Sequence, residues 1–182
     1  MNTKNLAIAS TVGVVAIVAL LFAYPAVAAS TAAPQNVNAQ QLLQHYQSMP
    51  LQRVDLKVGQ TITIDSVAGG YQQVGNAAAN GTATGKMTMQ VSGSLTRGFV
   101  LSTTGGSISV NGTTYTISAG SAELGPYGVH LVGQGQAGTS AQFLFSVLNL
   151  GKFGSTNYGV LRVDLTTGSS EFVARLLVTI SA

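Results

Sequence analysis

The chain has 182 residues but only eight Lys or Arg and five Asp or Glu side chains, so charged residues make up 7% of it, against about 25% in an average soluble domain. Hydrophobic residues make up 46%, glycine occurs 22 times, and cysteine and tryptophan are absent. This composition excludes an intrinsically disordered chain, a disulfide scaffold and a zinc site built on thiolates. The basic residues are scattered singly, which argues against nucleic-acid binding.

The first residues have the composition of an export signal. A lysine and the terminal amine precede an uncharged apolar stretch from Leu6 to Tyr24, and an Ala-Val-Ala sequence then ends at Ala28. This order is typical of a secretory signal peptide cleaved between Ala28 and Ala29. The stretch is also long enough to span a bilayer, so residues 1–28 are either a signal peptide or a retained membrane anchor. Both interpretations predict a secreted or cell-surface protein.

Residues 29–50 are small, polar and uncharged, as in a linker. Within them Asn38 is a helix-capping residue, and we expect a short helix over residues 39–48. Its apolar edge consists of Leu42, Leu43 and Tyr46. A helix of this length is not stable alone and must pack against something.

From residue 51 onward the hydrophobic period is two, which predicts β-strands. Several segments place apolar residues on alternate positions of one face. These are Ile62 and Ile64; Met87, Met89 and Val91; Ala141, Phe143, Phe145 and Val147; Leu161, Val163 and Leu165; and Phe172, Ala174, Leu176, Val178 and Ile180.

One turn is specified by its residues. Asn111-Gly112 separates two alternating segments, and this pair favours the type I′ turn of a two-residue hairpin. The register then pairs Val110 with Thr113 and Ile108 with Tyr115.

Eight to ten short strands with Gly, Ser and Asn turns indicate an all-β protein. We expect residues 51–182 to form a single antiparallel β-sandwich or jelly-roll-like domain, preceded by the N-terminal hydrophobic helix. The Gly-rich stretches 69–85 and 133–138 are expected to be surface loops or the ends of strands weakened by glycine.

Candidates for catalysis are few. Asp164 and Glu171 flank a predicted turn and could approach each other as the two acids of a glycoside hydrolase do. The simpler interpretation is an outward row of side chains in which Arg162 and Arg175 offset the acids. We therefore expect no enzymatic activity, and we expect His130 to be an ordinary strand residue.

No metal or cofactor site is predicted. Met87 and Met89 have the spacing of a thioether site for Cu(I), but alternate strand positions favour core packing. His45 lies four residues before Met49, which is a weak metal-binding spacing. A turn residue, Tyr127, is the best exposed aromatic candidate for sugar binding.

Two acceptor patterns for N-glycosylation are present, at Asn80 and Asn111. Both lie on predicted turns of a chain expected to be exported. At Asn111 the alternative is that Asn-Gly serves the turn alone.

The chain resembles a class of small exported β-sandwich proteins common in archaea. The resemblance covers about residues 60–182 and is carried by 105–108, 115–120, 133–135, 163–165 and 171–172. Some similar proteins form surface threads or pili, in which the N-terminal tail of one subunit completes the sheet of the next. The resemblance implies no site residue.

Two functions follow as expectations. The first is a non-catalytic cell-surface structural or interaction protein that associates with itself or with another envelope protein, assembling through its N-terminal segment. Residues 61–64 are then either a donated strand or an ordinary first strand. The second is a membrane-associated binding module, or an accessory subunit of a membrane complex, anchored by residues 6–24.

Overall fold

The computed structural model describes residue 44 and residues 55–182. Residues 61–181 are almost entirely β-strand. The strands are β1 Thr61–Gln73, β2 Asn76–Thr82, β3 Thr84–Leu95, β4 Gly98–Val110, β5 Thr113–Leu124, β6 His130–Ala137, β7 Ala141–Phe153, β8 Thr156–Thr167 and β9 Ser170–Ser181.

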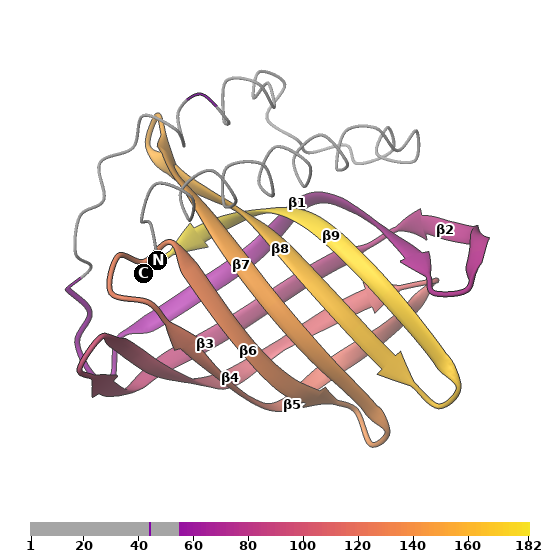
Figure 1. Ribbon diagram of the computed structural model, residues 1–182, viewed down its shortest axis with the longest axis horizontal. Helices are drawn as coiled ribbons and strands as arrows, with labels where there is room; N and C mark the ends of the chain where they lie inside the picture. Colours follow the sequence, from indigo (N-terminus) through magenta and orange to yellow (C-terminus); the bar gives the residue numbers. More distant parts are fainter. Residues whose placement is uncertain (1–43, 45–54) are drawn as a thin grey trace, which may run out of the picture.

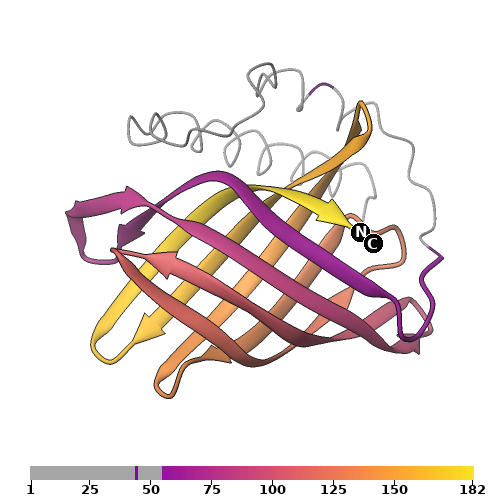
Figure 2. The same cartoon turned by 180° about the vertical axis from the view of Figure 1, so that it is seen from behind.

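The strands form a closed eight-stranded antiparallel barrel (Figures 1 and 2), so the predicted β-sandwich is wrong. β3 to β9 pair in chain order, and β1 closes the barrel by pairing with β3 on one side and β9 on the other. β2 pairs only with the end of β1 and extends the hairpin past the barrel. The pairing of β1 with β9 joins residues about 100 or more positions apart in the sequence, which no local pattern of hydrophobicity reports.

The prediction of all-antiparallel strands is confirmed, and so is the predicted hairpin. Val110 pairs with Thr113 and Ile108 with Tyr115. The turn residues Asn111 and Gly112 have φ values of 52° and 72°, as a type I′ turn requires.

The predicted apolar faces all point into the barrel, where they form one hydrophobic cluster. Met89, Leu101, Val163, Leu165 and Leu176 have no exposed surface. The interior is therefore filled by side chains, as expected for a barrel of eight strands.

The Gly-rich stretches are strands rather than loops. Residues 69–85 form the end of β1, all of β2 and the start of β3, and residues 133–137 lie in β6. Gly133 and Gly135 occupy inward positions, where an added Cβ would lie 2.5 Å and 2.6 Å from the rings of Phe145 and Phe143. Because Gly133 and Gly135 have no side chains, the rings of Phe145 and Phe143 occupy the space beside them.

The two ends of the barrel differ in what they carry. The proximal end, where the described chain starts at Asp55, holds the connections 96–97, 125–129 and 154–155 and the C-terminus. The distal end holds the turns 74–75, 111–112, 138–140 and 168–169. At the distal end the hydroxyl of Tyr71 donates a hydrogen bond of 2.9 Å to Asn111 Oδ1, which ties two hairpins together.

Candidate functional site

The register of the sheet aligns outward-facing, mostly polar residues from five neighbouring strands, β5 to β9. The row nearest the distal end runs Ala119, Gln136, Gln142, Thr166, Glu171, each paired with the next. The second row runs Ser121, Gln134, Leu144, Asp164, Val173. The two rows give this part of the outer wall three amides, two hydroxyls and two carboxylates.

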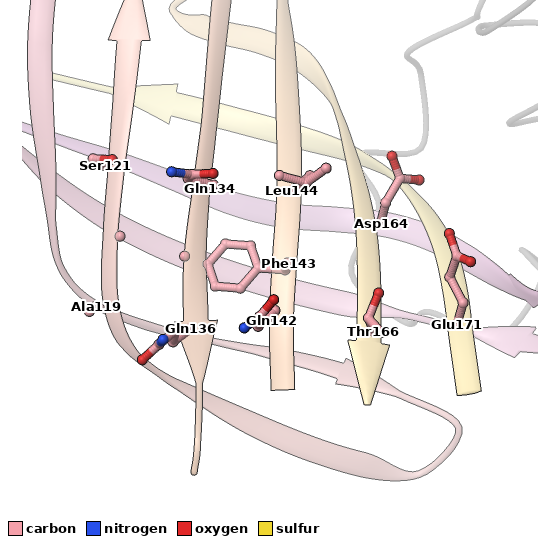
Figure 3. A pocket seen from close by; sticks show the side chains of 12 residues that line it. Ala119, Ser121, Gln134, Gln136, Gln142, Phe143, Leu144, Asp164, Thr166 and Glu171 are labelled. Carbon is pink, nitrogen blue, oxygen red and sulfur yellow. The ribbon is translucent and has the colours of Figure 1, made fainter. Parts of the chain in front are cut away.

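These rows line a groove of about 660 Å³, called here the outer groove (Figure 3). Its lining residues are Ala119, Gly120, Ser121, Gln134, Gly135, Gln136, Gln142, Phe143, Leu144, Asp164, Thr166 and Glu171. The groove lies on the outside of the barrel, toward the distal end.

Gly135 and Phe143 form part of the floor of the outer groove. Phe143 is 2% exposed and belongs to the interior cluster, and its ring lies against the backbone of Gly135. Because Gly135 has no side chain, the interior ring supports the wall directly beneath the groove. The outward neighbours Gln134 and Gln136 remain exposed on either side.

Charge in the outer groove is partly neutralised. Asp164 Oδ1 accepts a hydrogen bond of 3.0 Å from Nε of Arg162 and forms an ion pair of 3.0 Å with its Nη2, and the Asp164 side chain is 28% exposed. The second described ion pair, between Lys86 and Asp65, lies on β3 and β1, away from the groove. The groove is thus mainly an uncharged hydrogen-bonding surface, with Glu171 as its second carboxylate and Leu144 as its exposed large apolar residue.

The two candidate acids lie in the same groove but are not an isolated pair. Glu171 pairs with Thr166 and Asp164 pairs with Val173, so the carboxylates are diagonal neighbours on the outer wall, with α-carbons about 7–8 Å apart. The simpler interpretation is confirmed for one of its two pairs, because Arg162 contacts Asp164, whereas no ion pair between Arg175 and Glu171 is present in the described residues.

The other predicted residues lie apart from this groove. Met87 and Met89 are buried in the core, as predicted, and His130 is an exposed residue at the start of β6. Tyr127 is 47% exposed on the connection 125–129 at the proximal end. Within the described residues no group of three or more His, Asp or Glu side chains has the arrangement of a metal site.

Both glycosylation candidates are exposed near the distal end. Asn111 occupies the predicted turn. Asn80 lies in β2 instead of a turn, and its Nδ2 donates to the carbonyl of Ala77.

The predicted cleavage site at Ala28 and Ala29, His45, Met49 and the apolar stretch 6–24 lie outside the described residues. Among the residues that the structure describes, none belongs to a helix with the length and hydropathy needed to cross a bilayer.

A second, smaller cavity of about 110 Å³ lies at the proximal mouth of the barrel. Apolar side chains form most of it, with Asn149 and Asn157 as its polar members. Asn149 is already engaged, because its amide donates to the carbonyl of Gly128 and its Oδ1 accepts from the amide of Gly151. This volume is well below the roughly 300–1,000 Å³ of a typical ligand pocket.

The amides Gln134, Gln136 and Gln142 were missed by sequence reasoning. They stand on two strands and become neighbours only through the register between β6 and β7. A signal was present, since all three occupy polar positions that alternate with inward apolar or glycine positions. Nothing in the sequence alone said which strands would lie beside each other.

No family model matches this chain, and no curated protein or solved structure matches it either.

Proposed function

We propose that this chain is a non-catalytic, exported protein of the cell surface that acts by binding a partner protein at the outer groove. The observation that carries this proposal is the outer groove itself, a polar surface of about 660 Å³ shared by five strands. The interior of the same barrel is filled by side chains, so the described part of the molecule offers its binding surface outside.

The chemistry of the outer groove favours a polypeptide surface rich in amides and hydroxyls. Its glutamines each provide both donors and an acceptor, and the exposed Leu144 adds an apolar contact. Charged residues make up only 7% of this chain, so a second copy offers a sparsely charged polar surface and is a suitable partner, as is another envelope protein. Because Asp164 is held by Arg162, the groove is better suited to recognition than to acid–base chemistry.

Assembly by donation of residues 61–64 is not part of this proposal. These residues belong to β1, which pairs with β3 and β9 of its own barrel. Strand donation needs an unpaired sheet edge on the acceptor. In the described residues, the outer side of β2 is the strand edge that closure of the barrel leaves without a strand partner.

The test compares two substitutions at exposed strand positions on opposite sides of the barrel. Gln142→Arg places a cation in the outer groove, whereas Thr84→Arg places one on β3, diametrically opposite β7 in the strand order. We expect Gln142→Arg to weaken association at least about tenfold, because a long cationic side chain would fill the groove and lose its hydration at the interface core, and Thr84→Arg to leave it unchanged. The measurement is the size and composition of the undenatured particle purified from its own cells.

Equal association of the parent and the Gln142→Arg variant would contradict the proposal. The composition of the particle separates the two kinds of partner, since it contains either this chain alone or a second protein.

A further inference from the structure

In the part of the chain that the structure describes, exposed large apolar side chains gather in two places. Val132 and Leu144 lie on the outer wall of the barrel, and Leu95 and Tyr127 lie at its proximal end. Exposed apolar residues that stand singly are normal on a protein surface, whereas neighbouring ones mark contact sites. Both places therefore merit comparison as interaction surfaces.

The pair on the outer wall borders the outer groove. Val132 pairs with Glu123 across β5 and β6, while Leu144 pairs with Gln134, two residues along β6 from Val132. Val132 and Leu144 are thus diagonal neighbours, close enough to contact one partner side chain together. Val132 is 58% exposed and Leu144 57% exposed, and Glu123 is also exposed. We call Glu123, Val132 and Leu144 the outer patch.

The outer patch carries a negative charge without a partner. The ion pairs of the described residues are those of Lys86 with Asp65 and of Arg162 with Asp164, so neither involves Glu123. Arg162 lies in the same cross-strand row as Glu123 but three strands away, which is about 14 Å at the usual strand spacing. The Glu123 carboxylate is therefore available to a cation from outside.

The pair at the proximal end carries a positive charge. Leu95 is 47% exposed beside the turn between β3 and β4, and Arg97 is exposed in that turn. Tyr127, also 47% exposed, lies on the connection between β5 and β6 at the same end (Figure 1). The two connections adjoin, since an added Cβ on Gly98 would lie 3.5 Å from the α-carbon of Gly125. We call Leu95, Arg97 and Tyr127 the proximal patch.

The two patches are complementary. Arg97, like Glu123, takes part in neither of the described ion pairs, and each patch combines its single charge with two apolar side chains. Arginine and tyrosine are among the residue types that dominate the binding energy of interfaces, and opposite charges fix the register of a contact. The proximal patch stands on turns and the outer patch adjoins a groove, so a projecting surface meets a hollowed one.

We propose that the partner bound at the outer groove is the proximal end of a second copy of this chain. Arg97 of one copy faces Glu123 of the next, and the apolar side chains of the two patches pack together. Because the two surfaces differ, the contact is heterologous, and its repetition gives a ring or an open filament. This inference rests on the function proposed above and adds the identity of the partner.

The test exchanges the two charges in the full chain purified from its own cells. Arg97→Glu and Glu123→Arg each place like charges in the contact, so each variant should associate with itself at least about tenfold more weakly than the parent. The double variant restores opposite charges and should associate within about threefold of the parent. The measurement is sedimentation velocity over a series of protein concentrations.

A mixture of the two single variants gives a second test. Contacts between an R97E copy and an E123R copy join opposite charges in both directions, whereas contacts within either variant join like charges. The mixture should therefore assemble although each variant alone does not. Lys152→Glu is the matched control, because it makes the same change of charge at an exposed residue outside both patches and should leave association unchanged. Unchanged circular dichroism spectra confirm that the variants are folded.

Several results would overturn this inference. They are a parent chain that stays monomeric, an R97E variant that associates as the parent does, and a double variant that associates no better than the single ones. A particle that contains a second protein, lost in E123R and Q142R but kept in R97E, would also overturn it and leave the proposed function in place. Failure of the proposed function is distinct, because Q142R then leaves association unchanged.

Discussion

At the scale of single residues, inward glycines are what allow large side chains to fill so small a barrel. Gly133 and Gly135 lie on β6, opposite the paired positions Phe145 and Phe143 on β7. The two rings lie 5.7 Å apart between centroids and are tilted by 32°. Packing at this density leaves no room for an added methyl group without a shift of neighbouring atoms.

We therefore expect Gly135→Ala to destabilise the protein by about 1–3 kcal/mol, the usual cost of overpacking a core. An added Cβ would lie 2.5 Å from the carbonyl oxygen of Ala119 and 2.6 Å from Phe143 Cζ. The measurement is chemical denaturation of the two variants and the parent.

Gly105→Ala is the matched control. Gly105 also lies in a strand, but nothing is within 4 Å of its added Cβ, so the substitution should be neutral or stabilising by up to about 1 kcal/mol. Equal stabilities for the two variants would show that Gly135 does not have this packing role.

At the scale of elements, closure depends on β1 reaching both β3 and β9. Register shifts accompany this geometry, between Ser66 and Ala68 in the β1–β9 pair and between Thr88 and Met89 in the β3–β4 pair. Bulges of this kind increase the local twist and bend a strand. Together with the inward glycines, they let the meander curl until its first and last strands meet.

Closure of the barrel between β1 and β9 predicts which backbone amides exchange slowly with solvent. Backbone amides of β1 that bond to β9 over Ala68–Gln73 should be as protected as those of β7, because both strands belong to one cooperative unit. Amides on the outer side of β2 should exchange orders of magnitude faster, since β2 pairs only with β1. The measurement is native-state exchange followed by NMR or mass spectrometry, and rapid exchange along the β9-facing side of β1 would contradict closure.

Some elements of the fold could be predicted from the sequence, and others could not. The Asn111-Gly112 hairpin and the inward faces of β3, β7, β8 and β9 were predicted correctly, because a turn and a period of two are local properties. The barrel was missed because alternation is the same in a barrel and in a sandwich. The segment 133–138 was interpreted as a surface loop or a strand end weakened by glycine, because the inward positions Gly133 and Gly135 of β6 lack the apolar side chains that mark a strand.

The outer groove could also be predicted from the sequence only in part. Asp164 and Glu171 were recognised as neighbours because a short turn connects their strands. Gln136 and Gln142 belong to the same row, but their place beside the acids depends on the register of three strand pairs. A site built from cross-strand rows is visible only once the order of the strands is known.

At the scale of the whole molecule, the barrel is polarised. The described chain enters at the proximal end, while the outer groove and the candidate glycosylation sites Asn80 and Asn111 lie toward the distal end. An exported protein held at its N-terminal side would present these features outward. Glycans at the distal turns would be compatible with this orientation.

If the chain passes through a compartment that glycosylates asparagine, Thr82→Ala and Thr113→Ala should each reduce the native mass by one glycan. Each substitution removes an acceptor pattern and leaves the asparagine in place. Thr84→Ala, an exposed change outside both patterns, is the control. An intact mass equal to that of the bare polypeptide in the parent protein would contradict glycosylation at both sites.

The most direct test of the central claim is whether the distal end is reachable from outside intact cells. Ser140→Cys places a single thiol on the exposed distal turn 138–140 of a chain that has no other cysteine. The measurement is labelling of intact cells with a membrane-impermeant maleimide. A surface protein displayed as proposed is labelled before lysis, whereas labelling that occurs only after lysis would contradict the account.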